Sequence, residues 1–307
     1  MLRVLVAAIL LLFFVSVAHA AVCTVHVDDL DFGNVDTLGN SPATSSTDIT
    51  ISCDGITPGT EKITFCGNIG AGSGGVSGGV RQSTGSGGSL DFGLYAAAGG
   101  SVPWGSTATS GLGPPHSIEL AVSGESASMT AHLYGQVPSG QSATPTGTYL
   151  SSFSTSDGDF KYAEGDLDCS SPGGADDAPA EFAVRASVAA NCLLETHDLD
   201  FGTAGIIGSP IDADTSMSIT CTPDTDYSIS IDGGASGDPV HRVLHDGQKT
   251  VSYGLYADQQ HGQQWATDTV SGDGNGTTQT VGVYGRVPAQ AATPGSYSDT
   301  VVVTISY

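Results

Sequence analysis

Six cysteines are the residues whose type and spacing predict the most specific chemistry in this chain. They are Cys23, Cys53, Cys66, Cys169, Cys192 and Cys221. Their even number favours disulfide bonds. A metal site is not expected, because no C-x-x-C pair occurs and the eight histidines do not sit at metal-ligand spacing. We therefore expect disulfide chemistry, no bound metal and no cofactor.

Paired carboxylates could support a second chemistry, glycoside hydrolysis, which uses two of them. The candidate pairs are Asp176 with Asp177 and Asp212 with Asp214. Both pairs lie in sequence typical of turns or linkers, without a positioned base or aromatic neighbours, so they are more typical of solvated charges. The GAGSGG run lacks the strand and helix context of a phosphate loop, and no G-x-S-x-G motif with a plausible triad occurs. The sequence predicts that the protein is not an enzyme.

Composition and charge indicate the elements that must position these residues. Glycine accounts for 43 of 307 residues, and short runs rich in Val, Ile, Thr and Tyr are separated by Gly/Ser/Asp turns. This pattern predicts an all-β fold, either a sandwich or a barrel. The formal net charge of −24 repels nucleic acids and anionic membranes, so neither is an expected partner.

The first 20 residues have the pattern of a secretory signal peptide. Arg3 supplies the positive start, an apolar run of about a dozen residues follows, and Ala18-His19-Ala20 fits the small-residue cleavage rule. The apolar run is shorter than the ~20 residues that a membrane span needs. We expect cleavage before Ala21, export through the inner membrane and no membrane span in the mature chain.

The rest of the chain contains two copies of one pattern. CTVHVDDLDFG begins at Cys23, and CLLETHDLDFG begins at Cys192. In each copy a tryptophan follows the tyrosine of a Gly-Leu-Tyr motif by nine residues. Shared landmarks in the same order indicate an internal repeat.

The repeat predicts how the cysteines pair. The equivalent cysteines of the two copies are separated by 30 and 29 residues, and closing such a loop stabilises a domain by roughly 3 to 4 kcal/mol in the chain-entropy model. One further pair then remains in the first copy. The expected bonds are Cys23–Cys53, Cys192–Cys221 and Cys66–Cys169.

The repeat also divides the mature chain into a first domain over residues 21–163, a Gly/Asp/Pro-rich linker over 164–181 and a second domain over 182–307. The start of the second domain has the period of two that is typical of a half-buried strand. Its alternating apolar residues are Phe182, Val184, Ala186 and Val188. No comparable strand precedes Cys23.

These motifs resemble the spore coat protein U domain family. Its pattern begins with Cys and LDFG, continues through a second Cys and a Leu-Tyr motif with Trp, and closes with YGR-P, G-x-Y and a Val/Thr-rich strand. The most specific match is the final stretch VYGRVPAQAATPGSYSDTVVVTISY. The resemblance implies two tandem immunoglobulin-like sandwich or barrel domains of the pilin type, each completed by a donor strand. It also implies the two-domain tip adhesin of archaic chaperone–usher pili.

The resemblance further implies partners and a location. A periplasmic pilus chaperone would pair with the last strand before an outer-membrane usher adds the subunit to a fibre on the cell surface. The residues of that strand are Val301, Val303, Ile305 and Tyr307. The second domain would then accept a strand from a neighbouring pilin subunit.

The donor-like segment lies in an unexpected place. In this family the donor precedes the first cysteine, but here Ala21-Val22 is too short to serve. We expect residues 182–190 to complete the first domain within the same chain, which would place the subunit at the tip of the fibre. The alternative is that this segment is simply the first strand of the second domain.

The first copy is longer than the second in two loop segments, residues 66–88 and 105–117. Loops on a rigid sandwich often carry binding function, so their apolar residues are candidates for adhesion to an abiotic or host surface. These residues are Ile69, Val76, Val80, Leu112 and Pro114. Alternatively, the loops pack onto the sandwich or are tolerated insertions. Val102 and Trp104 are not among the candidates, because Trp265 matches Trp104 in the second copy and a shared core role explains both.

Two other functions stay open. A non-pilus coat or matrix protein could contain the same domains. A carbohydrate- or calcium-binding module could use Asp273 and Asn275 in SGDGNGTT, but a Gly-rich turn explains that stretch equally well. The remaining ligands of an EF-hand are missing.

Overall fold

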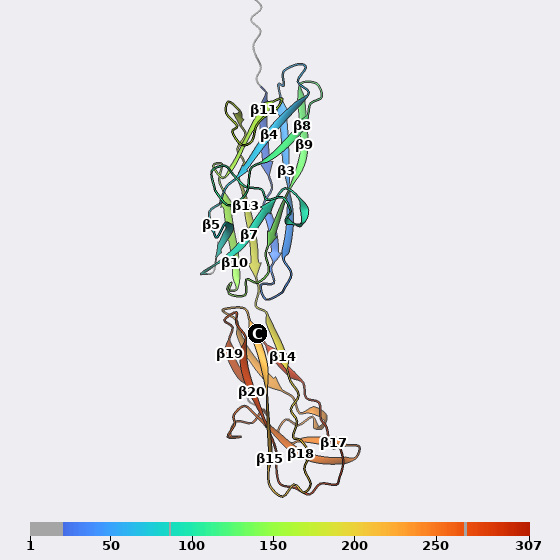
Figure 1. Cartoon of the computed structure of the whole chain (residues 1–307). Helices are drawn as coiled ribbons and strands as arrows, with labels where there is room; N and C mark the ends of the chain where they lie inside the picture. The colour runs from blue at the N-terminus through green and yellow to red at the C-terminus, as the bar shows by residue number, and fades with distance from the viewer. Residues whose placement is uncertain (1–20, 86, 267–268) are drawn as a thin grey trace, which may run out of the picture.

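The protein forms two β domains arranged end to end (Figure 1). The structure is a computed structural model that describes residues 21–85, 87–266 and 269–307. The expected signal peptide, residues 1–20, lies outside these residues. The all-β prediction is confirmed, since the helical elements are the short 3-10 turns η1 (Ala98–Gly100) and η2 (Gly234–Ser236). Among the described residues, no helix has the length and apolar character needed to cross a membrane.

The first domain is a sandwich of a long curled sheet and a smaller one. The long sheet has the order β1-β3-β9-β7-β6-β10-β13-β2, with β5 paired to β6, and the smaller sheet has the order β12-β11-β4-β8. The strands are β1 (Val22–Val27), β2 (Leu30–Asn34), β3 (Ala43–Asp54), β4 (Lys62–Ile69), β5 (Val76–Ser77), β6 (Val80–Gly85), β7 (Gly88–Tyr95), β8 (His116–Ala121), β9 (Ser126–Val137), β10 (Gly147–Phe153), β11 (Gly158–Glu164), β12 (Asp176–Asp177) and β13 (Phe182–Val188).

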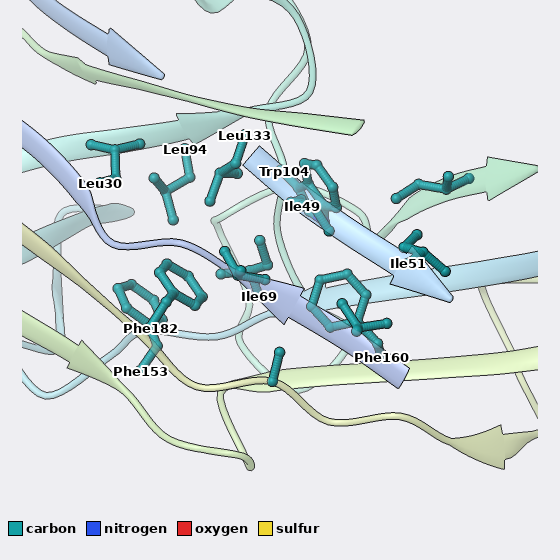
Figure 2. Close-up of a cluster of buried hydrophobic side chains, with 14 of the residues drawn as sticks. Leu30, Ile49, Ile51, Ile69, Leu94, Trp104, Leu133, Phe153, Phe160 and Phe182 are labelled. Atoms are coloured by element: carbon teal, nitrogen blue, oxygen red, sulfur yellow. The ribbon is translucent and has the colours of Figure 1, made fainter. Parts of the chain in front are cut away.

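The core of the first domain follows from the alternation of side chains along its strands. In β7, Leu90, Phe92 and Leu94 are buried while the residues between them are partly exposed, which is the pattern of a strand with one face on a core. Figure 2 shows that the apolar side chains of several strands meet in one cluster. Trp104 belongs to this cluster and is 1% exposed, in accord with its predicted core role.

The second domain repeats the same arrangement with fewer strands. One sheet has the order β14-β15-β20-β18-β17, and the other has the order β19-β16-β21. The strands are β14 (Cys192–Thr196), β15 (Ile211–Cys221), β16 (Asp226–Ile231), β17 (Arg242–Asp246), β18 (Lys249–Tyr256), β19 (Val270–Asp273), β20 (Gln279–Val287) and β21 (Val303–Ser306).

A pair of glycines shows how closely the two copies agree. A β-carbon on Gly135 would lie 2.7 Å from the Phe32 ring and 2.9 Å from a Leu30 methyl carbon. A β-carbon on Gly285 would meet its two equivalent neighbours, Phe201 and Leu199, at 2.8 and 2.9 Å. Any larger residue in either YG motif would therefore displace the leucine and phenylalanine of LDFG, which close onto the bare α-carbon of the glycine.

Three disulfides fasten the two domains internally, and they join the cysteines that the repeat pairs. The two equivalent bonds close 30 and 29 residues, and the extra bond of the first domain closes 103. The bonds are Cys23–Cys53, Cys192–Cys221 and Cys66–Cys169.

The segment 164–181 is not a free linker, and here the expected boundary differs from the structure. Cys169 ties it to β4, β12 pairs with β11, and Ala178 and Ala180 are buried in the first core. Lys62 also forms an ion pair with Asp166 at 2.6 Å. The first domain therefore extends through β13, and the second begins at about Cys192. Glycine and proline in this segment serve tight turns rather than a mobile connection.

Candidate functional site

The central feature of the first domain is a groove filled by β13. One edge of β13 pairs antiparallel with β10, from Phe182 opposite Phe153 to Val188 opposite Gly147. The other edge pairs parallel with β2, where Val184 lies opposite Leu30. Backbone groups are thus engaged on both edges, so β13 is an interior strand of a sheet belonging to the domain that precedes it.

The apolar face of β13 fills this groove. Phe182 stacks on Phe153 with ring centroids 4.4 Å apart and an interplanar angle of 3°, and Figure 2 shows the two rings side by side. Val184, Ala186 and Val188 are buried in the same core. Burial of Phe182 and the two valines contributes at most about 5 to 8 kcal/mol.

Polar groups at the rim of the groove hold β13 at one position. Asp29 accepts the backbone N–H of Ala183 at 2.8 Å and the Arg185 guanidinium at 3.1 Å. Asn34 accepts the backbone N–H of Ala189 through its side-chain oxygen at 3.0 Å. These contacts come from the loop before β2 and from its end, so the LDFG region forms one wall of the groove.

The corresponding groove of the second domain is open. Its sheet follows the order of the first domain through five strands, and Ser298 then bridges His245 as Leu150 bridges Thr84. In the first domain β13 and β2 come next. In the described part of the second domain, no strand occupies the place of β13.

Exposure of equivalent side chains gives the same result. In the first domain Leu30, Tyr149 and Phe153 are 0%, 1% and 2% exposed. Their counterparts in the second domain are all partly exposed: Leu199, Tyr297 and Val301. Among the described residues, the first core cluster contains 31 buried residues and the second contains 12. The second domain therefore presents an apolar groove that no strand of the described residues covers.

Each groove also has a buried arginine at its base, and sequence reasoning missed both residues. Arg81 donates to the backbone oxygens of Gly70 and Ile69 at 2.7 and 2.6 Å, and Arg242 makes the equivalent bonds to residues 231 and 232. Burial lowers the pKa of Arg81 to about 10 and also lowers the pKa of Arg242. A sequence signal was present, because each arginine precedes the aromatic residue before Gly-Leu-Tyr by 11 residues.

One polar substitution distinguishes the open groove from the filled one. Asp299 stands where the first domain has the fully buried Ser151. It accepts the Tyr253 hydroxyl at 2.7 Å, and burial together with this bond raises the pKa of Tyr253. The open groove therefore has a partly exposed carboxylate in its wall.

The last strand of the chain lies at a sheet edge. β21 pairs with β16 on one side, and the described residues supply no partner for its other side. Val301, Val303 and Ile305 pack partly against the second core. Tyr307 lies beyond the end of β21 and is 58% exposed, so it does not share their contacts.

The two candidate adhesion loops lie against each other. A β-carbon on Gly79, at the turn between β5 and β6, would lie 3.7 Å from the backbone oxygen of Gly111. Val76 and Pro114 are exposed, and Val80 is partly exposed. Figure 1 places β5 on the side of the first domain, away from its far end.

Two of the predicted adhesion residues are wrong. Ile69 is fully buried because it is the last residue of β4 and points into the core. Leu112 is 6% exposed because its loop folds back, with the Gly105 N–H bonded to the Pro114 oxygen at 2.9 Å. Val102, which the sequence grouped with the core residue Trp104, is instead 43% exposed next to this loop.

The carboxylate pairs lie in strands, not in turns or linkers as expected. Asp177 in β12 forms an ion pair with Lys161, and Asp212 in β15 accepts both Nε and Nη2 of Arg286 at 2.6 and 2.7 Å. Asn275 closes a turn by accepting the Thr277 N–H. The described residues contain no group of three or more His, Cys, Asp or Glu side chains arranged to hold a metal ion.

Together, the fold and the two grooves define a class: tandem immunoglobulin-like sandwich domains of the pilin type. The chain belongs to the family of the Spore Coat Protein U domain, whose model matches residues 9–155 and 178–304. Both copies of the repeat are thus members of one family, as their motifs predict. A search of curated proteins finds no match to the chain.

One solved structure supports the fold. The chain is similar to the tip adhesion subunit in the chaperone–tip subunit pre-assembly complex of archaic chaperone–usher Csu pili from Acinetobacter baumannii. The TM-score is 0.54 at 15% identity, over 94% of this chain and 100% of the matched chain. The chain also matches the CupB6 tip adhesin from Pseudomonas aeruginosa, with a TM-score of 0.38 at 14% identity, over 92% of this chain and 93% of the matched chain.

Proposed function

We propose that this protein is an adhesive subunit of a secreted surface fibre assembled by the chaperone–usher route, and that it occupies the far end of the fibre. The observation that carries the proposal is the presence of one fold in two states within one chain. The first domain contains its completing strand, β13, and the second domain has an open groove of the same design. In this proposal the second domain accepts a strand from the next subunit.

The physical chemistry of the open groove supports this role. Unpaired backbone groups beside exposed apolar side chains are an aggregation hazard for a free protein. An added strand removes both problems, because it supplies backbone hydrogen bonds and fills the apolar pockets with alternate side chains. A periplasmic chaperone would protect the domain until an outer-membrane usher brings the donor, and the free edge of β21 offers a place for it to pair.

The distal position is supported by the way in which β13 is used. A subunit within a fibre gives one strand forward and receives one from behind. Here the segment with the donor pattern is already paired on both edges inside its own chain. A subunit that uses its donor strand internally ends the fibre.

Antibody labelling of fibres tests the assignment. Gold-labelled antibodies against residues 21–163 should mark one end of surface fibres on the producing cells, and deletion of the gene should remove the label. Labelling along the whole shaft would contradict the distal position. Labelling of a cell coat without fibres would favour the coat or matrix alternative instead.

We further propose that the side patch of the first domain, defined as Val76, Val102 and Pro114, contacts apolar surfaces. The variant Val76→Asp/Val102→Asp should reduce adhesion of fibre-bearing cells to polystyrene several-fold, because two charges would have to be desolvated at the contact. The matched control is Val240→Asp, at a residue of the second domain that is also 43% exposed. Equal adhesion of both variants, with normal fibre numbers, would exclude the patch.

A further inference from the structure

Asp29 holds β13 through two different groups. Its Oδ1 atom accepts the backbone N–H of Ala183 at 2.8 Å. Its Oδ2 atom accepts Nη2 and Nε of Arg185 at 3.1 and 3.3 Å. The first contact is open to any strand, because every residue except proline has a backbone N–H. The second contact requires a cation at one position of the strand.

The position of this cation specifies the register of β13, which the alternation of apolar residues alone does not. A slip of one residue would turn the apolar face of β13 to solvent, and burial opposes it. A slip of two residues would return an apolar face to the core, so alternation alone discriminates weakly against it. Such a slip would move Arg185 by about 6.6 to 6.8 Å along the groove, away from Asp29. The ion pair therefore marks a single register.

The open groove has a carboxylate at the same place. Asp198 follows Cys192 by six residues, as Asp29 follows Cys23. The adjoining turn is also the same, since Asp31 accepts the Gly33 N–H at 2.8 Å and Asp200 accepts the Gly202 N–H at 2.7 Å. Asp198 is exposed, and it makes no hydrogen bond or ion pair with any other residue that the structure describes.

Within the described residues, every lysine and arginine of the chain already has a partner other than Asp198. Each of the lysines and arginines there already bonds to a carboxylate or to backbone oxygens of its own domain or groove. These residues are Lys62, Arg81, Lys161, Arg185, Arg242, Lys249 and Arg286. With a net charge of −24, the protein also attracts a cationic segment more strongly than an anionic one.

We propose that Asp198 sets the register of the strand that enters the second domain by pairing with an arginine or lysine of that strand. The partner is an extended segment of another polypeptide with apolar residues at alternate positions. Its cation faces outward between the second and third of these positions, as Arg185 does between Val184 and Ala186. This inference rests on the proposed function of the second domain as a strand acceptor.

A double-mutant cycle with strand peptides tests the pairing. The probe is a fluorescently labelled peptide EFAVRASVAA, the sequence of residues 181–190, and its partner probe has glutamine in place of arginine. Each is titrated at low salt with the full chain and with the variant Asp198→Asn, which keeps an acceptor oxygen but removes the charge. The matched control is Asp214→Asn, which removes an exposed charge from β15.

We expect the arginine peptide to bind the unchanged chain about 2- to 5-fold more tightly than the glutamine peptide, as befits an exposed ion pair. The preference should vanish in Asp198→Asn, persist in Asp214→Asn and weaken with added salt. Asp198→Arg should reverse it in favour of a peptide with glutamate at this position. If every peptide binds equally to every chain, the second domain is an acceptor, but Asp198 does not pair with a cation of the strand. If no peptide binds, both the acceptor role and this inference are wrong.

Discussion

Val184→Asp is expected to remove most of the stability of the first domain. Val184 is 1% exposed at the centre of β13, between Ser151 of β10 and Leu30 of β2. An aspartate there would place a carboxylate in an apolar core. Such burial costs several kcal/mol, and a typical domain has only about 5 to 15 kcal/mol of stability.

Tryptophan fluorescence measures this effect domain by domain. Trp104 belongs to the first core and Trp265 to the second, and the chain has these two tryptophans. In urea titrations of a Trp265→Phe background, Val184→Asp should shift the Trp104 transition to much lower denaturant. The matched control, Leu150→Asp, changes a residue of β10 that is 39% exposed and should leave it within about 0.5 kcal/mol.

A change in the urea transition reported by Trp265, rather than by Trp104, would contradict the assignment of β13 to the first domain. If Val184→Asp left the Trp104 transition unchanged and, in a Trp104→Phe background, moved the Trp265 transition instead, residues 182–188 would belong to the second domain in solution. The groove of the first domain would then be open as well, and the proposed difference between the two domains would be lost.

Replacing Cys192 and Cys221 with alanine should unfold the second domain and leave the first folded. The bond closes 29 residues, and its loss is expected to cost about 3 to 4 kcal/mol. The first domain can tolerate such losses because β13 completes its core. The second has 12 buried residues in its described core and an open groove, so little stability remains to offset the loss.

Near-ultraviolet circular dichroism and the separate tryptophan signals measure the outcome. The Trp265 signal should become that of an unfolded chain at 37 °C, while the Trp104 transition should match that of the unchanged protein. The corresponding double replacement of Cys66 and Cys169 serves as a control, because it should lower the Trp104 transition instead. A cooperative Trp265 transition at the original temperature would show that the bond is dispensable.

The sequence predicted the features that repeat or alternate. Two copies of LDFG and Gly-Leu-Tyr allow the cysteines to be matched, and the period of two in β13 identifies a strand. The sequence left two assignments of β13 open, completion of the first domain or the first strand of the second, because its pairing with β10 and β2 depends on residues 29 to 154 positions away along the chain. Alternation specifies a buried face but not the partner that covers it.

For the adhesion residues, the sequence located the loops but not the exposed side chains. The first copy has more residues between shared motifs than the second, which reveals two insertions, but this difference does not show which of their apolar residues face inward. Ile69 continues β4 into the core, whereas Val76 stands on a separate hairpin. Val102 was discounted because it neighbours a core tryptophan, yet it lies on the outside of the turn that buries Trp104.

The position of β13 also determines how the protein responds to tension. The short connection from Val188 to Cys192 joins the two domains, so a pull between them reaches the first domain at the end of β13. Figure 1 shows β13 running toward this junction along the length of the molecule. The pull therefore acts parallel to the strand, against its pairing with β10 and β2 along its length. Detachment requires hydrogen bonds on both edges to shear together, and the rate of that step governs how long the first domain keeps its completing strand under force.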